Sequence, residues 1–99
     1  MHQETRVVNV RSEPFDVYIG RWHPRFPNEP TYKWGNPFKL SKGVSIGEVL
    51  DKYEAHIRSH PELIAALIEL KGKRLGCWCV PRPCHGHVLV KLIKEFFPD

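Results

Sequence analysis

A chain of 99 residues with 41% hydrophobic and 26% charged residues has the composition of one ordered globular domain, and its length excludes a second core. The formal net charge of +4 permits a phosphate-bearing partner, but it is also ordinary for the solubility of a small domain. The apolar runs are short and the first residues lack an apolar signal core, so we expect a cytoplasmic protein with no membrane segment. We predict a single domain over residues 1–99.

The amino-terminal part predicts two short strands and a long loop. The β-branched run Val7–Val10 is typical of a buried strand, and Phe15–Ile19 alternates apolar and polar residues as a second strand or an extended edge segment would. Between Gly20 and Gly43 we find no periodicity, and four prolines interrupt the chain. The aromatic residues of this loop, which argue that it is ordered, are Trp22, Phe26, Tyr32, Trp34 and Phe38.

The second half predicts helices around one more strand. Ser45 and Glu48 have the spacing of a capping box, and the helical period that follows predicts a helix over Ile46–Arg58. Pro61 suits the first turn of a second helix, which ends before Gly72.

The last two predicted elements are a strand over Leu75–Cys79 and a helix over His85–Phe97. Alternation along the strand predicts Cys77 and Cys79 on one face and Trp78 on the other.

This order of elements predicts an α/β fold: a small sheet with at least two parallel strands, about three helices and the long aromatic and proline-rich loop. Ligands of open α/β sheets bind beyond the carboxyl ends of the strands. Arg11–Glu13 and the turn Cys79–His85 should therefore share one edge, which the aromatic loop could cover.

The densest group of reactive side chains is the turn that contains all three cysteines. Cys84 stands at the predicted start of a helix, where free amides, the helix dipole and the neighbouring Arg82, His85 and His87 should lower the pKa of its thiol. Such a thiolate could be a nucleophile with His85 as proton carrier, in acyl, glycosyl or phosphoryl transfer alike.

Other interpretations of the same turn remain open. An odd cysteine count in one short segment does not fit a secreted disulfide framework, which leaves thiols, metal ligands or one local bridge. The spacing lacks a C-x-x-C pair, so we expect no cofactor, with a zinc site as the alternative. In the plainest interpretation, the cysteines are small buried hydrophobic residues and His85 caps the helix. The zinc ligands would come from Cys77, Cys79, Cys84, His85 and His87.

Two further segments supply candidate ligand-binding residues. At the end of the first strand, Arg11 could hold a phosphate and Glu13 could act as a general base, or Arg11 could form an ion pair with Glu13 or Asp16. In the turn after Trp34, we expect Asn36 to brace the backbone through its own amide. Trp34 itself suits either a base-stacking wall or loop packing.

Three separated motifs give the chain a family resemblance. They are Val-Asn-Val-Arg at residues 8–11, Trp-Gly-Asn-Pro-Phe at 34–38 and Cys-Trp-Cys-Val-Pro-Arg-Pro-Cys-His-Gly at 77–86. By these motifs the chain resembles a family of domains of unknown function, family 4326, found widely in phages and bacteria. A more distant similarity is to another uncharacterised family with an Asp-Val-Arg strand end and a Cys-His-Arg turn, where this chain has Asn9 for the Asp and Gly86 for the Arg. That parallel implies a strand-end Arg beside a Cys-His helix start.

Three functions follow as alternatives. The first is a domain that binds, and acts on, a nucleotide-like or other phosphate-bearing small molecule. The second is a non-catalytic module for nucleic acid or protein, stabilised by zinc, and the third is a phage-type protein that acts on a host factor. The sequence does not choose between an enzyme and a binding module. For the first function, the predicted catalytic residues are Cys84, His85 and Glu13, and the predicted ligand-binding residues are Arg11, Ser12, Trp34, Asn36 and Arg82.

Overall fold

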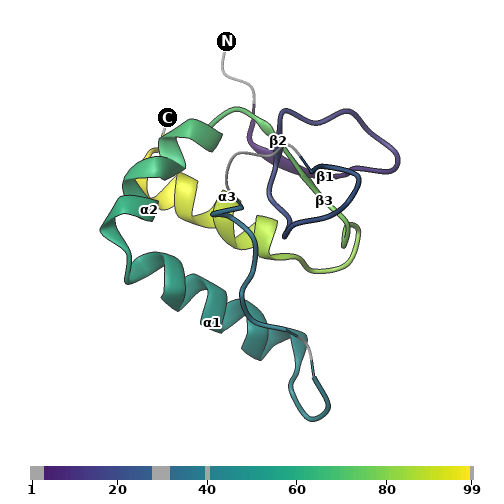
Figure 1. Cartoon of the computed structure of the whole chain (residues 1–99). Helices are drawn as coiled ribbons and strands as arrows, with labels where there is room; N and C mark the ends of the chain where they lie inside the picture. Colours follow the sequence, from purple (N-terminus) through teal and green to yellow (C-terminus); the bar gives the residue numbers. More distant parts are fainter. Residues whose placement is uncertain (1–3, 28–31, 40, 99) are drawn as a thin grey trace.

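Three short parallel strands form the sheet in the order β1–β3–β2 (Figure 1). They are β1 (Arg6–Asn9), β2 (Val17–Tyr18) and β3 (Arg74–Cys77). The computed structural model describes residues 4–27, 32–39 and 41–98. The predicted parallel pairing of the first and last strands is confirmed, and so is the single-domain α/β fold.

The helices begin where local signals predicted. In α1 (Ile46–Arg58), the Ser45 hydroxyl accepts a hydrogen bond from the Glu48 amide at 3.1 Å, as the capping spacing suggested. The second predicted helix is α2 (Pro61–Ala66), which tightens into a 3-10 turn, η1 (Leu67–Leu70). The last helix is α3 (His85–Phe96).

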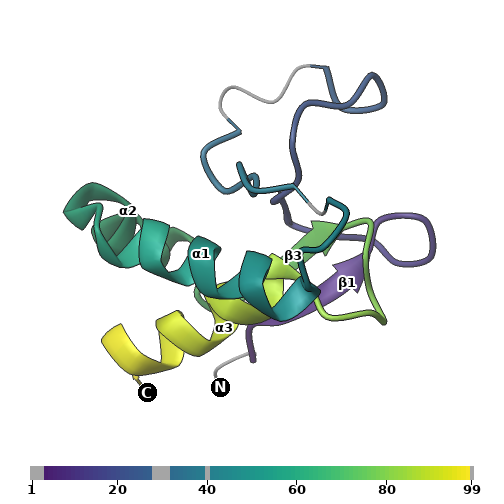
Figure 2. The ribbon, with the colours of Figure 1, turned by 90° about the horizontal axis from the view of Figure 1, so that it is seen from below.

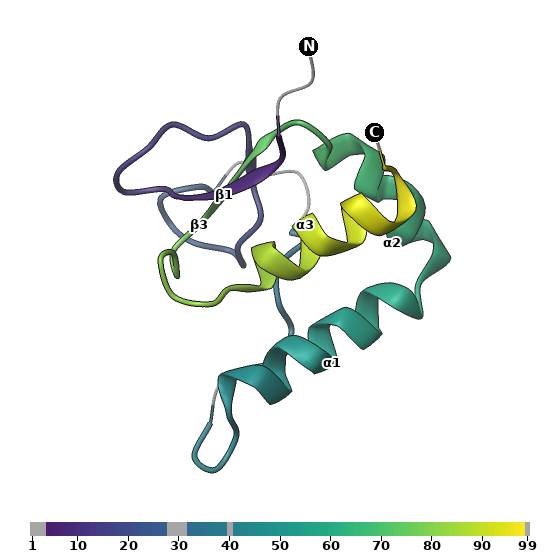
Figure 3. The same ribbon diagram turned by 180° about the vertical axis from the view of Figure 1, so that it is seen from behind.

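Helix α3 lies between α1 and the sheet, as Figures 1 and 3 show from opposite sides. The helix packs tightly at Gly86, because a Cβ atom there would lie 2.8–2.9 Å from side-chain carbons of Val7 and Ile19. Leu75 and Cys77 face this helical layer and belong to its buried core. The start of α3 is thereby held at the carboxyl ends of the strands.

The opposite face of β3 is covered by aromatic side chains from the segments before and after β2. A Cβ atom on Gly76 would meet the Phe15 ring, and the Trp78 ring lies 5.9 Å from that of Phe26. Seen from below (Figure 2), the segment after β2 arches over the sheet and returns to the start of α1. Residues near the beginning and near the end of this loop line the pocket described below.

Two strands are shorter than the sequence predicted. β2 is confined to Val17–Tyr18, and β3 ends at Cys77 instead of Cys79. Beyond the end of the ladder, the side-chain amide of Asn9 donates to the main-chain oxygen of Val80 at 2.9 Å. Cys79 consequently lies in an exposed bend.

The described residues include no helix that is both long enough and apolar enough to cross a membrane.

Candidate functional site

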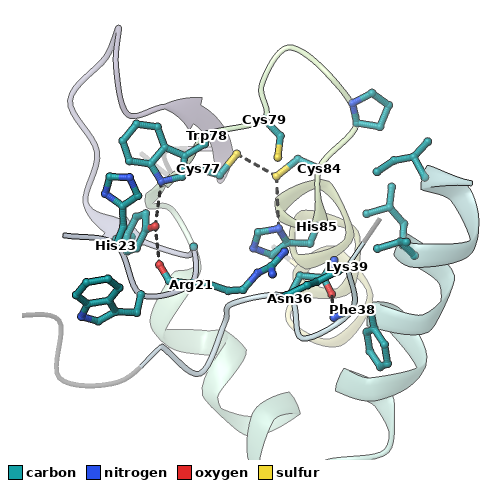
Figure 4. A pocket seen from close by; sticks show the side chains of 17 residues that line it. Arg21, His23, Asn36, Phe38, Lys39, Cys77, Trp78, Cys79, Cys84 and His85 are labelled. Atoms are coloured by element: carbon teal, nitrogen blue, oxygen red, sulfur yellow. Dashed lines mark hydrogen bonds between the residues drawn. The ribbon is translucent and has the colours of Figure 1, made fainter. Parts of the chain in front are cut away.

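A pocket with a volume of about 740 Å³ opens at the carboxyl edge of the sheet (Figure 4). Its walls come from the end of β3 with the turn after it, the first residues of α3, the loop that follows β2, and the first half of α1. The volume falls within the range of small-molecule sites, which is roughly 300–1,000 Å³. The expected edge of the sheet is thus hollow and large enough for a ligand.

Two buried thiols lie side by side in this pocket. The Sγ atoms of Cys77 and Cys84 are 2.9 Å apart, and each residue is only 1% exposed. Cys84 is also the N-cap of α3, and its sulfur accepts the Gly86 amide at 3.4 Å. Cys77 is the last residue of β3 and Cys84 is the N-cap of α3, so the turn between these two elements brings the sulfurs together.

The pKa values of the two thiols shift in opposite directions, and that of Cys84 shifts against the prediction. A hydrogen bond from the Cys84 thiol, aided by the amides of Cys79 and Val80, lowers the pKa of Cys77. Donating that hydrogen bond, together with burial, raises the pKa of Cys84. The expectation of an acidic Cys84 is therefore corrected: the single amide at the helix start does not outweigh burial and the neighbouring sulfur, and Cys77 is the more acidic thiol of the pair.

His85 completes this group of proton-sharing side chains. Its Nε2 lies 2.7 Å from the main-chain oxygen of Ile19, and since a carbonyl oxygen only accepts, Nε2 carries the hydrogen. Nδ1 then presents a lone pair toward the Cys84 sulfur, 3.6 Å away. Burial lowers the pKa of His85, so its imidazole stays neutral and able to accept a proton.

The opposite side of the pocket is cationic. Figure 4 shows the Arg21 side chain extending from the loop after β2 toward His85, with Lys39 beside Asn36. Among the described residues, no carboxylate lines the pocket, and none forms an ion pair with Arg21 or Lys39. The pocket consequently has a positive side that this part of the chain does not neutralise.

A hydrogen-bonded chain holds the backbone of Arg21. The Tyr18 hydroxyl donates to the main-chain oxygen of Arg21 at 2.8 Å and accepts the indole N–H of Trp78 at 3.0 Å. The Trp78 ring in turn lies 4.6 Å from the ring of His23. These contacts link the loop after β2 to the end of β3.

Apolar side chains make up the rest of the lining. Trp22 is 61% exposed at the rim, an unusual position for the largest side chain. The amide oxygen of Asn36 accepts the Phe38 amide at 2.9 Å, so the predicted bracing of this turn is confirmed. The apolar wall beside the turn is formed by Phe38, Ile46, Val49 and Leu50.

The pocket unites some of the predicted site residues. Asn36, Cys84 and His85 line it, as do Cys77 and Cys79.

Five of the predicted site residues are not among those that line the pocket; they are Arg11, Ser12, Glu13, Trp34 and Arg82. Trp34 is buried and packs in the core, where the Tyr53 hydroxyl donates to its main-chain oxygen at 2.7 Å. Ser12 and Arg82 are exposed. The expected convergence of the strand-end residues with Cys84 and His85 is therefore not seen.

The strand-end charges pair differently from either ion pair that the sequence suggested. The Arg11 guanidinium lies 5.3 Å from the centre of the Trp78 ring. Glu13 pairs with Arg6 at 3.2 Å, and Asp16 pairs with Arg74 at 3.0 Å. Both suggested pairs of Arg11 were wrong, because residues at the amino ends of β1 and β3 reach these carboxylates instead.

The zinc alternative needs at least three ligands that converge. Within residues 4–27, 32–39 and 41–98, no group of three or more His, Cys, Asp or Glu side chains is arranged to hold a metal ion. His87 has a different contact, because its Nδ1 accepts the main-chain N–H of Cys84 at 3.1 Å and so caps α3.

Sequence reasoning missed the cationic residues Arg21 and Lys39 and the rim residue Trp22. One signal was present: if Phe15–Ile19 is read as a strand parallel to the others, the residues directly after Gly20 must lie at the carboxyl edge. Lys39 carried no such signal, since only the return of the loop to α1 places it there.

The comparisons with known proteins identify a family and give no activity. The sequence profile of the family described as "Domain of unknown function (DUF4326)" matches residues 3–95. The chain belongs to this family. It is 39% identical over 93 residues to "Uncharacterized protein R718" of Acanthamoeba polyphaga mimivirus, covering 80% of this chain and 67% of that protein. No solved structure is significantly similar to it.

A second relative comes from a phage. The "Uncharacterized 12.4 kDa protein in nrdA-td intergenic region" of Enterobacteria phage T4 is 34% identical over 97 residues, which cover 95% of this chain and 82% of the phage protein. The predicted family is confirmed.

Proposed function

We propose that the pocket binds a nucleotide-like or other phosphate-bearing small molecule. One observation supports this most strongly: Arg21 and Lys39 face a cavity in which no described residue provides a carboxylate. Guanidinium and ammonium groups are the side chains that bind phosphate best, and an uncompensated pair in a concave site favours an anionic ligand.

The other walls of the pocket favour a ligand with a flat or apolar part. Trp22 offers an exposed ring at the rim, and the start of α1 offers the aliphatic side chains of Ile46 and Leu50. A nucleotide combines these features, because its base has a π-face for stacking while its phosphates need cations.

The thiol group provides the reactive chemistry of the same pocket. The Cys77 thiolate is a nucleophile, and the neutral His85 is placed to take the proton of Cys84. The predicted catalytic roles of Cys84 and His85 are retained in this proposal, with Cys77 added to them. Glu13 is not part of it, because its carboxylate pairs with Arg6.

Calorimetric titration of the full chain with ADP, and with adenosine as the uncharged counterpart, tests the proposal. We expect ADP to bind and adenosine to bind far more weakly. Arg21→Ala and Lys39→Ala should each weaken ADP binding by about tenfold to a hundredfold, the usual cost of losing a hydrogen bond to a charged group. The matched controls are Arg25→Ala and Lys42→Ala, which remove exposed charges outside the lining.

Two results would refute the proposal. One is equal affinity for ADP and adenosine. The other is a single-stranded RNA oligonucleotide that binds tightly, with a steep salt dependence, and loses affinity equally in all four variants. That pattern would mean that the positive charge acts as an extended nucleic-acid surface and not as a pocket.

A further inference from the structure

All three cysteines of the chain contribute to one pocket wall, and all three are free thiols. They differ in access, since Cys77 and Cys84 are buried whereas Cys79 is exposed. The two buried sulfurs are 2.9 Å apart, closer than non-bonded sulfur atoms ordinarily pack. The binding of a phosphate-bearing ligand does not by itself explain why two thiols lie this close together.

We propose that Cys77 and Cys84 are a redox pair that reacts with an anionic low-molecular-weight disulfide and closes to an intramolecular disulfide. This activity goes beyond the binding of a phosphate-bearing ligand and does not depend on it.

The geometry around the two sulfurs favours the exchange. Cys77 ends β3 and Cys84 begins α3, and the two elements are held in place by the buried core that surrounds both residues. Their sulfurs therefore need to move only a short distance to reach bonding distance, which is about 2.05 Å. The hydrogen bonds that lower the pKa of Cys77 also supply the thiolate that such an exchange requires.

The reaction takes place in two steps. First, the Cys77 thiolate attacks one sulfur of the small disulfide, which breaks its S–S bond, forms a mixed disulfide with Cys77 and releases one thiolate. Next, Cys84 gives its proton to Nδ1 of His85, and the Cys84 sulfur attacks the sulfur of Cys77, which releases the second thiolate. The protein loses two electrons and one proton, which His85 passes to the solvent, and the small disulfide gains the two electrons and leaves as two thiolates that take up protons from the solvent.

The charge of the pocket selects the class of oxidant. Arg21 and Lys39 line the side of the pocket opposite the thiols, and no described carboxylate lines this pocket, so a disulfide that carries carboxylates is attracted to the site. Glutathione disulfide is a probe of this class, and cystamine, which is cationic, is the matched counterpart. We expect oxidation by glutathione disulfide to be faster than oxidation by cystamine.

The experiment uses the full chain with the Cys79→Ser substitution, which removes the exposed thiol and leaves only the proposed pair. The reduced variant is incubated with mixtures of oxidised and reduced glutathione, quenched with acid, treated with N-ethylmaleimide and weighed by intact mass spectrometry. We expect both remaining thiols to be lost without any attached glutathione. The unsubstituted chain should also lose Cys77 and Cys84 as one pair.

The matched variants each lack one member of the pair. Cys77→Ser and Cys84→Ser, each combined with Cys79→Ser, cannot close a bridge, so each should stop at a mixed disulfide or stay reduced. Circular dichroism of the reduced proteins checks that they fold. If either fails to fold, the Cys79→Ser chain still decides the question by itself.

Two outcomes would overturn the inference. In one, the Cys79→Ser chain carries glutathione or stays reduced under conditions in which the unsubstituted chain loses two thiols, which would assign the bridge to Cys79. In the other, neither protein loses two thiols. Both outcomes are distinct from a failure of ADP binding, because this experiment contains no nucleotide.

Discussion

Nε2 of His85 lies 2.7 Å from the main-chain oxygen of Ile19, and this one contact determines which nitrogen of the imidazole faces the thiols. The acceptor is a carbonyl at the carboxyl end of β2, so the tautomer depends on the sheet and not on any titratable neighbour. Ile19 is two residues before Arg21. The segment that holds the His85 imidazole through the Ile19 oxygen therefore also carries the Arg21 cation into the pocket lining.

The stability of the protein should depend on pH because of this buried imidazole. Burial lowers the pKa of His85 below its ordinary value of 6.5, so the unfolded chain binds the proton more readily than the folded one. The contribution of His85 to the free energy of unfolding is therefore complete above pH 6.5 and is lost as the pH falls toward the folded pKa. Calorimetry should show Tm decreasing over this range.

His85→Gln is the control for that decrease, since its amide keeps a donor for the Ile19 oxygen but does not titrate. Its Tm should depend less on pH than that of the unsubstituted chain. An NMR titration that finds the His85 ring half-protonated at or above pH 6.5 would contradict the burial argument.

Gly86 should be intolerant of any side chain. A Cβ atom there would lie 2.8–2.9 Å from Ile19 and Val7, which would force α3 away from the sheet. We expect Gly86→Ala to lower the free energy of unfolding by about 1–3 kcal/mol in urea denaturation, the usual cost of overpacking. Gly47→Ala is the matched control: its Cβ would approach only the Ser45 hydroxyl, at 3.8 Å, and alanine should raise stability by up to about 1 kcal/mol. Equal changes in the free energy of unfolding for the two variants would show that α3 is not tightly packed against the sheet.

The pKa of Asp16 should reveal its ion pair with Arg74, the first residue of β3. Its carboxylate accepts the side chain and the main-chain N–H of Arg74, and these hydrogen bonds lower its pKa from 3.8 to about 2. Asp16 therefore stabilises the fold fully above pH 3.8, and this contribution is lost as the pH falls to about 2. In an NMR titration, Arg74→Gln should bring the pKa of Asp16 back toward 3.8, whereas Arg6→Gln, which removes the partner of Glu13, should leave it unchanged.

The Tyr18 hydroxyl should affect binding through Arg21. Tyr18→Phe removes the donor to the Arg21 main-chain oxygen and leaves the Trp78 indole N–H without that acceptor. If the pocket binds ADP, we expect affinity to fall by about twofold to tenfold, in line with one neutral hydrogen bond of about 0.5–1.5 kcal/mol. The control is Tyr32→Phe, whose hydroxyl donates at 2.6 Å to Phe26, outside the pocket. A similar loss in both variants would mean that the effect is a general loosening of the loop.

The sequence by itself determined the local elements. The capping pair Ser45 and Glu48 marks the start of α1 to the residue, and the apolar period after His85 marks α3, because caps and helical periods depend on neighbours a few positions apart. The location of the site at the carboxyl edge also followed from the order of elements alone.

Tertiary structure decided which side chains meet at that edge. A strand of two residues such as β2 has no sequence signal for its direction, so the position of Arg21 depended on pairing with β3 across the sheet. Trp34 and Trp22 are alike in sequence context, yet packing buried the first and left the second at the rim. The order in which Cys77 and Cys84 lose their protons depends on burial and on hydrogen bonds between elements, which no spacing of residues along the chain can specify.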